Sequence, residues 1–284
     1  MKLKNYFQYL TPCLQQRAFI KKPPRSTRQY NEAIVSLTSI AQRYKLLTNV
    51  IASLINQSTS PSKVYLWIKT GTMHLLPKKL DQLIELGLCI EEVEDLGPHT
   101  KLIPALEKLP NLHIITADDD LIYPYHWLEN LFDEHKRHNP EAITCYPARY
   151  INAFEQKGAN SLRPYKQWPR IGSTIRPDQQ AHALALGYTG VVYAPNCFNS
   201  EVFNKAAFKK LCPRADDLWF KAIAIHSGTT IYKTAKNFGN EIYVPFSQQF
   251  GLKKNNVSSD GNVEQMLDLL NHYDLWNHLT ATPS

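Results

Sequence analysis

Residues 112–124 read Leu-His-Ile-Ile-Thr-Ala-Asp-Asp-Asp-Leu-Ile-Tyr-Pro, a short apolar run that ends in three consecutive aspartates. Carboxylates so close together at the tip of a buried strand repel one another, and a bound cation would offset that repulsion. Hard divalent ions such as Mg²⁺ and Mn²⁺ prefer oxygen ligands and often share them with substrate phosphates. Asp118, Asp119 and Asp120 therefore predict a divalent-metal site. The alternative is a polar loop that caps the following helix.

The segments around this stretch indicate the fold. Short apolar, β-branched runs predict strands at 34–40, 64–68, 88–93 and 113–117. Segments with helical apolar spacing lie between these strands, at 43–57, 77–86 and 101–108. This alternation predicts βαβ units, and hence an α/β fold with a mainly parallel central sheet flanked by helices. Open sheets of this kind bind ligands at the carboxyl ends of their strands, where the aspartates lie.

The second half of the sequence is less regular. It predicts a strand at 142–151, a loop-like stretch at 153–177 and a strand after the glycine-flanked segment 186–193. A helix is expected from 216 to 228, and a last helix after Asp260. We therefore expect a single domain whose second half is irregular.

Composition limits the class of protein. The 284 residues are 43% hydrophobic, which suits one large α/β domain. No apolar run approaches the roughly 18 residues of a membrane-spanning helix, and the N-terminal segment lacks a secretory signal pattern, so a cytoplasmic protein is expected. The five cysteines are scattered and form no Cys-x-x-Cys pair, which predicts neither a disulfide framework nor a zinc site.

The net charge of +7 is concentrated at the N-terminus. Seven basic residues and no acidic ones precede Glu32, and the rest of the chain has 25 basic and 25 acidic residues. A neutral body argues against a nucleic-acid partner, which favours a basic surface across the folded domain. Residues 1–28 could instead lie on an anionic membrane, where each basic residue contributes about 1 kcal/mol. The alternative is a disordered, solubilising tail.

A second acidic pair, Asp216 and Asp217, begins the helix expected at 216–228. The helix dipole favours carboxylates there, so the pair could be a simple cap. Together, however, the two acidic clusters allow a division of labour. One cluster could hold a metal on a diphosphate, and the other could remove a proton from an attacking hydroxyl. Glycosyl transfer from a nucleotide sugar needs both.

These motifs, in this order, resemble the nucleotide-sugar glycosyltransferases with the GT-A fold, especially bacterial enzymes similar to glycosyltransferase family 2. The stretch 116–120 with Tyr123-Pro124 looks like the Asp-x-Asp metal motif of that family. The segments 187–190 and 215–219 look like its acceptor loop and base-bearing helix. The resemblance covers residues 34 to 228.

The resemblance implies a role for several residues. Asp120 would bind the metal, Mn²⁺ or Mg²⁺, directly, and Asp118 would contact the ribose or a metal-bound water. Asp217 would be the catalytic base, with Asp216 as the second choice. The remaining donor-site candidates are Thr38, Ser39, Arg43, Asp95, Lys101 and Asp119. The acceptor-site candidates are Trp168, Tyr188, Thr189 and Gly190.

The resemblance implies a metal-dependent, inverting hexosyltransferase. It would move a sugar from a nucleotide-diphosphate sugar, with a UDP-sugar favoured, to a glycan or lipid-linked acceptor in capsule, lipopolysaccharide or O-antigen synthesis. It divides the chain into a basic tail (1–31), a donor half (32–125), an acceptor half (126–250) and a C-terminal loop and helix (251–284). The tail would place the enzyme peripherally on the inner membrane.

Two other functional classes remain open at this stage. A metal-dependent nucleotidyltransferase or phosphohydrolase also uses aspartates at strand ends, although residues 38–41 are not the glycine-rich phosphate loop that it would normally show. A non-catalytic protein that binds sugar nucleotides is the other class.

The sequence does not determine which nucleotide the donor carries. The second strand ends in Lys69-Thr70-Gly71, where many relatives have an acidic turn.

Overall fold

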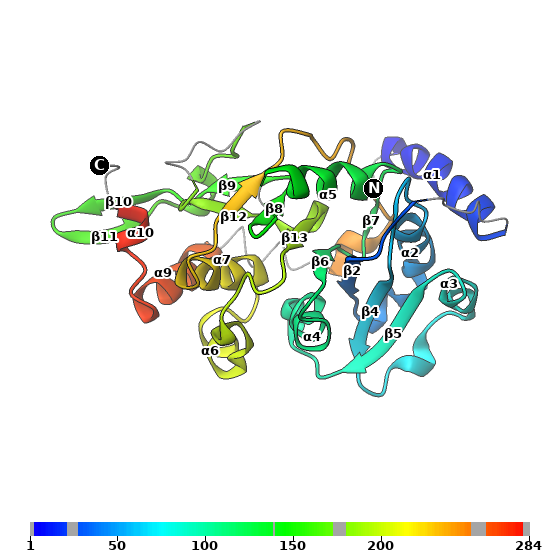
Figure 1. Cartoon of the computed structure of the whole chain (residues 1–284), viewed down its shortest axis with the longest axis horizontal. Coiled ribbons are helices and arrows are strands. Elements are labelled where there is room, and N and C mark those ends of the chain that lie inside the picture. Colours follow the sequence, from blue (N-terminus) through cyan, green and yellow to red (C-terminus); the bar gives the residue numbers. More distant parts are fainter. Residues whose placement is uncertain (1–2, 22–27, 139, 173–179, 251–259, 281–284) are drawn as a thin grey trace.

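The structure is a computed structural model, and it describes residues 3–21, 28–138, 140–172, 180–250 and 260–280. Figure 1 shows an elongated α/β molecule. Strands β2, β4 and β5 lie toward one end of it, and α7, α9 and the hairpin β10–β11 lie toward the other.

A seven-stranded sheet runs through the molecule in the order β14-β8-β13-β6-β2-β4-β5. Neighbouring strands are parallel except at β13, which is antiparallel to both β6 and β8. The strands are β2 (Ala33–Thr38), β4 (Val64–Lys69), β5 (Leu88–Val93), β6 (His113–Thr116), β8 (Ile143–Cys145), β13 (Val191–Tyr193) and β14 (Ile231–Lys233). The predicted α/β class with a mainly parallel sheet is confirmed.

Helices cover both faces of this sheet. The α-helices are α1 (Leu3–Lys21), α2 (Leu47–Ile55), α3 (Asp81–Ile84), α4 (Ile103–Lys108), α5 (Trp127–His138), α6 (Lys205–Leu211), α7 (Asp216–His226), α9 (Gly261–His272) and α10 (Asn277–Thr280). Two 3₁₀ helices, η1 (Ala41–Leu46) and η4 (Gly97–Lys101), follow β2 and β5. Successive side chains of β2 point to opposite faces of the sheet and pack in two different hydrophobic cores. Val35 and Leu37 pack in the core with α2 and α5, and Ile34 packs in the core with α7 and α9.

Four small two-stranded sheets complete the fold. The pairs are β1 (Gln29–Tyr30) with β3 (Ser60–Pro61), β7 (Leu121–Ile122) with β15 (Ile242–Tyr243), β9 (Ala148–Tyr150) with β12 (Ala183–Ala185), and β10 (Ala153–Gln156) with β11 (Ala159–Leu162). The β7–β15 pair lies directly after the three aspartates and brings residues 242–243 beside them.

Two predictions for the second half are wrong. The single strand expected at 142–151 is divided between β8 and β9, which belong to different sheets and flank Pro147, a residue without a backbone donor. The loop expected at 153–177 contains the antiparallel hairpin β10–β11. Lys157 and Gly158 connect its strands with φ values of 54° and 77°, as two-residue hairpin turns require.

Most of the N-terminal segment is a helix on the surface of the domain. Figure 1 shows α1 beside α2, and α1 packs against both α2 and β15. Cys13, Gln16 and Phe19 are buried in this contact, and the Asn49 side-chain amide donates to the Tyr9 hydroxyl at 2.7 Å. The alternative of a disordered tail is therefore wrong for residues 3–21. None of the helices in the described ranges is long and apolar enough to cross a membrane.

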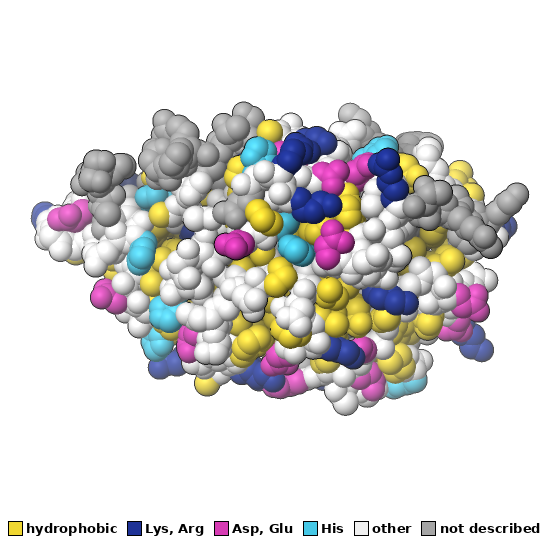
Figure 2. Space-filling model, viewed as in Figure 1, with side chains coloured by type: hydrophobic (Ala, Val, Ile, Leu, Met, Phe, Trp, Pro, Cys, Tyr) yellow, Lys and Arg dark blue, Asp and Glu magenta, His cyan; other side chains and the backbone are white. Residues whose placement is uncertain are grey.

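The surface charges agree with the neutral body expected from the sequence. Figure 2 shows acidic and basic side chains intermingled across one face of the molecule. On α5, Lys136 forms ion pairs of 3.7 Å with Asp133 and with Glu32.

Candidate active site

The aspartates lie between β6 and β7, at the carboxyl edge of the sheet. Asp119 points back toward the end of β2, where the Ser39 hydroxyl donates to its Oδ2 at 2.5 Å. An Arg43 nitrogen donates to Oδ1 of Asp119 at 2.5 Å. Because η1 directly follows β2, the neighbouring strands β2 and β6 bring these three residues together.

Asp120 lies beside this pair and has a different electrostatic environment. Its carboxylate is 3.6 Å from Arg43, and its backbone carbonyl accepts a hydrogen bond from Val244 at 2.8 Å. Burial, together with the negative charges of Asp118 and Asp119, raises the pKa of Asp120 to about 7. A further cation would lower this pKa, because it would favour the ionised carboxylate.

Lys101 joins the two acidic clusters. It ends η4, and its Nζ lies 3.1 Å from Oδ1 of Asp118 and 3.1 Å from Oδ2 of Asp216. Burial alone would lower the pKa of Lys101. The charges of Asp118, Asp216 and Asp217 outweigh burial and raise it well above the ordinary value. Carboxylates far apart in the sequence thus share one buried ammonium group.

Asp217 faces the loop that contains Gly187. The backbone N–H of Gly187 donates to Oδ1 of Asp217 at 3.1 Å. A Cβ atom at position 187 would lie 2.8 Å from that oxygen and 3.0 Å from Nζ of Lys101, so this approach requires glycine. Burial and the charge of Asp216 raise the pKa of Asp217 to about 7. Asp217 is only half-buried, whereas Asp216 is buried against Lys101.

Tyr123 connects the loop of the three aspartates to the loop 187–190, a contact that the sequence did not suggest. Its side chain is buried, and its hydroxyl accepts a hydrogen bond from the Asp118 backbone N–H at 2.7 Å. The same hydroxyl donates to the Tyr188 carbonyl at 3.1 Å. The sequence signal was only its place directly before Pro124.

Thr189 and Gly190, two of the predicted acceptor residues, are in contact with Trp127. The Trp127 indole N–H donates to the Thr189 carbonyl at 2.7 Å, and the Thr189 side chain is buried. A Cβ atom at Gly190 would lie 2.8 Å from the same indole nitrogen, and the φ of Gly190 is 115°. Tyr188 remains half-exposed, with its hydroxyl donating to Glu241 at 2.9 Å.

Three predicted residues do not join this group. Trp168 is fully buried in the core, where its indole N–H donates to the Arg163 carbonyl at 2.8 Å. Its ring therefore presents no face to an acceptor, and the stacking role expected for it is wrong. The Thr38 hydroxyl donates to the Trp67 carbonyl of the neighbouring strand at 2.9 Å. Asp95 is exposed, with Lys69 at 3.9 Å.

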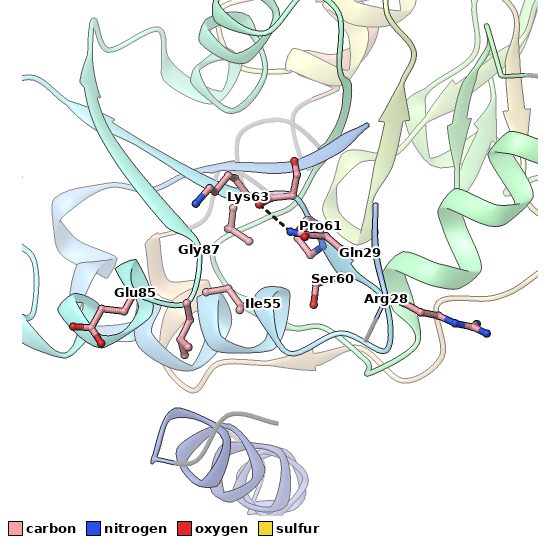
Figure 3. A pocket seen from close by; sticks show the side chains of 11 residues that line it. Arg28, Gln29, Ile55, Ser60, Pro61, Lys63, Glu85 and Gly87 are labelled. Carbon is pink, nitrogen blue, oxygen red and sulfur yellow. Dashed lines mark hydrogen bonds between the residues drawn. The ribbon is translucent and has the colours of Figure 1, made fainter. Parts of the chain in front are cut away.

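A cavity of about 300 Å³ lies at the opposite edge of the sheet. It is formed by the residues before β4 and β5 and by the end of α2, and its lining includes Ser62, Lys63, Gly87 and Ile55. Figure 3 shows the charged end of Arg28 directed away from it. Because it lies at the amino ends of the strands, it is remote from the aspartates.

Asp118 and Asp120 fit a metal that is shared with a substrate. Within the part of the chain that the structure describes, no three His, Cys, Asp or Glu side chains are grouped to hold a metal by themselves. A Mg²⁺ ion bound with a nucleotide commonly takes only one or two carboxylates, and phosphates and water supply its other ligands. Two carboxylates with a mutual repulsion that raises the pKa of Asp120 match that requirement.

The chain resembles known proteins in its structure and not in its sequence. No protein-family model matches the sequence, and no curated protein matches it significantly. Residues 1–349 of S. aureus TarS, solved in complex with UDP, align over 73% of this chain at 13% identity and a TM-score of 0.44. The chain spans 59% of that TarS fragment.

Two further structures cover more of the chain. The mannosyltransferase PcManGT of Pyrobaculum calidifontis, in complex with GDP-Man and Mn²⁺, aligns over 99% of this chain and 85% of its own, at 12% identity and a TM-score of 0.46. The inositol-1-phosphate CTP transferase of T. maritima aligns over 86% of this chain and 97% of its own, at 12% identity and a TM-score of 0.45. The TM-scores of all three structures lie below 0.5.

Proposed function

We propose that this chain is a metal-dependent glycosyltransferase that moves a sugar from a nucleotide-diphosphate sugar to a hydroxyl group of a glycan or lipid-linked acceptor. One observation carries the proposal. Lys101 lies 3.1 Å from both Asp118 and Asp216, so the strand-end aspartates and the acidic start of α7 form one site. A sugar bound between them would have its leaving diphosphate on one side and a carboxylate base on the other.

On the donor side, Asp118 and Asp120 would hold the ion, Mn²⁺ or Mg²⁺. When bound, such an ion supplies positive charge that stabilises the leaving diphosphate. The neighbouring Asp119 is held by Ser39 and Arg43, and this orients the loop. The Lys101 ammonium would reach the diphosphate or the sugar, because its partner Asp118 is itself a metal candidate.

On the acceptor side, Asp217 is the better candidate for the base. The residue is half-buried rather than buried, and its pKa of about 7 suits proton transfer near neutral pH. Asp216 is buried in an ion pair with Lys101 and would help to position the helix. Attack by an acceptor hydroxyl activated at Asp217, opposite the diphosphate, is a single displacement that inverts the anomeric carbon.

The base assignment is tested by comparing Asp217→Asn with Asp216→Asn. UDP-sugars and GDP-mannose serve as donors, a mixture of glycans as acceptors, and release of nucleoside diphosphate as the readout. Asp217→Asn is expected to bind donor normally and to transfer about 10²- to 10⁴-fold more slowly, the usual contribution of a general base. Normal transfer by Asp217→Asn would overturn the assignment. Pyrophosphate release from CTP with a sugar phosphate would favour a nucleotidyltransferase.

We further propose that α1 places the enzyme peripherally on an anionic membrane, where lipid-linked precursors of surface polysaccharides are built. Leu14 is 62% exposed on the outer side of α1, and Arg17 and Lys21 are exposed one and two turns along. Charge reversal at Arg17 and Lys21 is expected to release the chain from vesicles containing phosphatidylglycerol while leaving donor binding unchanged. Retention on those vesicles would contradict the membrane proposal.

A further inference from the structure

Two arginines beside the loop 187–190 form no ion pair with any of the residues that the structure describes. Arg149 on β9 and Arg170 form an isolated antiparallel bridge. The Tyr150 N–H donates to the Pro169 carbonyl and the Ile171 N–H donates to the Ala148 carbonyl, so the bridged residues form a non-hydrogen-bonded pair. Side chains of such a pair are the closest neighbours that two strands offer, and like charges there are destabilising.

Nearby groups hold these two side chains in place, and one of them, the Tyr188 hydroxyl, also donates to Glu241 at 2.9 Å. The Arg149 guanidinium lies 5.0 Å from the Tyr165 ring centroid and donates to the Trp168 carbonyl. Arg170 is exposed, and its Nη2 donates to the Tyr188 hydroxyl at 3.4 Å. Among the described residues, no carboxylate lies within 4.0 Å of either guanidinium.

The arginine pair is close to the candidate base. Tyr188, the partner of Arg170, directly follows Gly187, whose N–H binds Asp217. The pKa of Tyr165 responds to the charges of the candidate base and of both arginines. Burial and the charge of Asp217 raise its pKa, and the charges of Arg149 and Arg170 lower it. All three charged groups therefore act on one phenol.

We infer that Arg149 and Arg170 form an anion subsite that binds a phosphate or carboxylate group carried by the acceptor. Guanidinium groups match both anions with paired charge-assisted hydrogen bonds. An anion between them would remove the repulsion of the pair and would hold a neighbouring hydroxyl toward Asp217. The acceptor class is thus an anionic glycan or polyol phosphate. This inference rests on the proposed function for the identity of the acceptor side.

Matched ligands test the subsite by calorimetry on the full chain, alone and with UDP and Mn²⁺. The probes are glycerol 3-phosphate against glycerol, and glucuronate against glucose. Each anionic probe is expected to bind at least about tenfold more tightly than its neutral partner, as one charge-assisted contact would give. Arg149→Gln and Arg170→Gln should each lose about that factor. Arg163→Gln, an exposed arginine that stacks 4.1 Å from the Phe154 ring centroid, is the control and should lose none.

The outcomes separate this inference from the proposed function. Equal binding of charged and neutral probes, absence of binding by either anion, or an equal loss in Arg163→Gln would overturn the anion subsite. A fall in UDP affinity in Arg149→Gln or Arg170→Gln would also overturn it, because the anion would then be the donor diphosphate. Arginine-dependent binding of the probes without any nucleotide binding would preserve the subsite and contradict the glycosyltransferase.

Discussion

The donor and acceptor sides of the candidate site balance their charges in opposite ways. On the donor side, Asp119 and Asp120 lie within 4.0 Å of Arg43, and Asp118 within 3.1 Å of Lys101. On the acceptor side, Arg149 and Arg170 are cross-strand neighbours, and no carboxylate of the described residues lies within 4.0 Å of either guanidinium. The comparison suggests that the donor side is organised by its own ion pairs, whereas the acceptor side keeps positive charge available for a substrate.

Removing one cation from each side should give the largest difference. Lys101→Met leaves the buried Asp216 and the half-buried Asp118 without their shared partner, and breaking a buried ion pair costs about 3–5 kcal/mol of folding free energy. Arg170→Gln removes an exposed charge and should change stability by about 0.5 kcal/mol or less. Urea unfolding at pH 7 measures both. Equal losses in the two variants would show that the sides do not differ.

The acidity of the two clusters provides a second test. Asp120 and Asp217 have pKa values of about 7 in the folded chain, against an ordinary 3.8. The folded state therefore binds more protons than the unfolded state between these values, and the metal-free chain should lose stability as the pH rises through that window. Buried His99, His135 and Lys221 act in the opposite direction, because their pKa values are lowered to about 4, 4 and 7. The contribution of the aspartates is therefore the difference in the pH dependence of Tm between the wild-type chain and an aspartate variant.

Matched variants test whether the aspartates of the candidate site contribute to the change of Tm with pH. In Asp120→Asn, Tm should fall less, or rise more, with increasing pH than in the wild-type chain, whereas Asp268→Asn, at an exposed position on α9, should behave like the wild-type chain. Mn²⁺ with a nucleoside diphosphate should reverse the slope, because binding needs ionised carboxylates and would weaken by up to about tenfold per pH unit below 7. An identical pH dependence of Tm in Asp120→Asn and in the wild-type chain would contradict these assignments.

The smallest expected effect comes from the contact between the two sides. Tyr123→Phe removes the hydroxyl that joins the Asp118 N–H to the Tyr188 carbonyl, at a cost of about 1–3 kcal/mol for buried groups left unpaired. Transfer should slow while UDP affinity stays close to normal, because the donor ligands remain. Tyr125→Phe, an exposed tyrosine, is the control. Identical kinetics in the two variants would mean that the sides act independently.

Much of the first half could be predicted because its signals are local. The strand predicted at 88–93 has those bounds in β5, and the strand expected at 64–68 is β4. Apolar runs and turn residues within a few positions determine such elements. Asp118, Asp120 and Asp217 stood out for the same reason, since clustered acids at element ends can be recognised without knowing the partners.

The contacts that build the site could not be predicted, because they join distant segments through single bonds. Nothing in the sequence near Val244 indicates that its N–H binds the Asp120 carbonyl. Lys101 was expected at the donor, but its ion-pair contact with Asp216 depends on the position of α7. Trp168 was expected at the acceptor site, yet its ring packs in the hydrophobic core, where its N–H donates to the Arg163 carbonyl.

The measurement that tests the central claim most directly is calorimetric binding of UDP, GDP, CDP and dTDP, with Mn²⁺ and then with EDTA. The account predicts that one nucleotide binds tightly with Mn²⁺, that EDTA abolishes the binding, and that Asp120→Ala abolishes it as well. Asp268→Asn should bind like the wild-type chain. Failure of all four nucleotides to bind the folded protein with Mn²⁺, or binding that survives both EDTA and Asp120→Ala, would contradict a metal-diphosphate site at the aspartates.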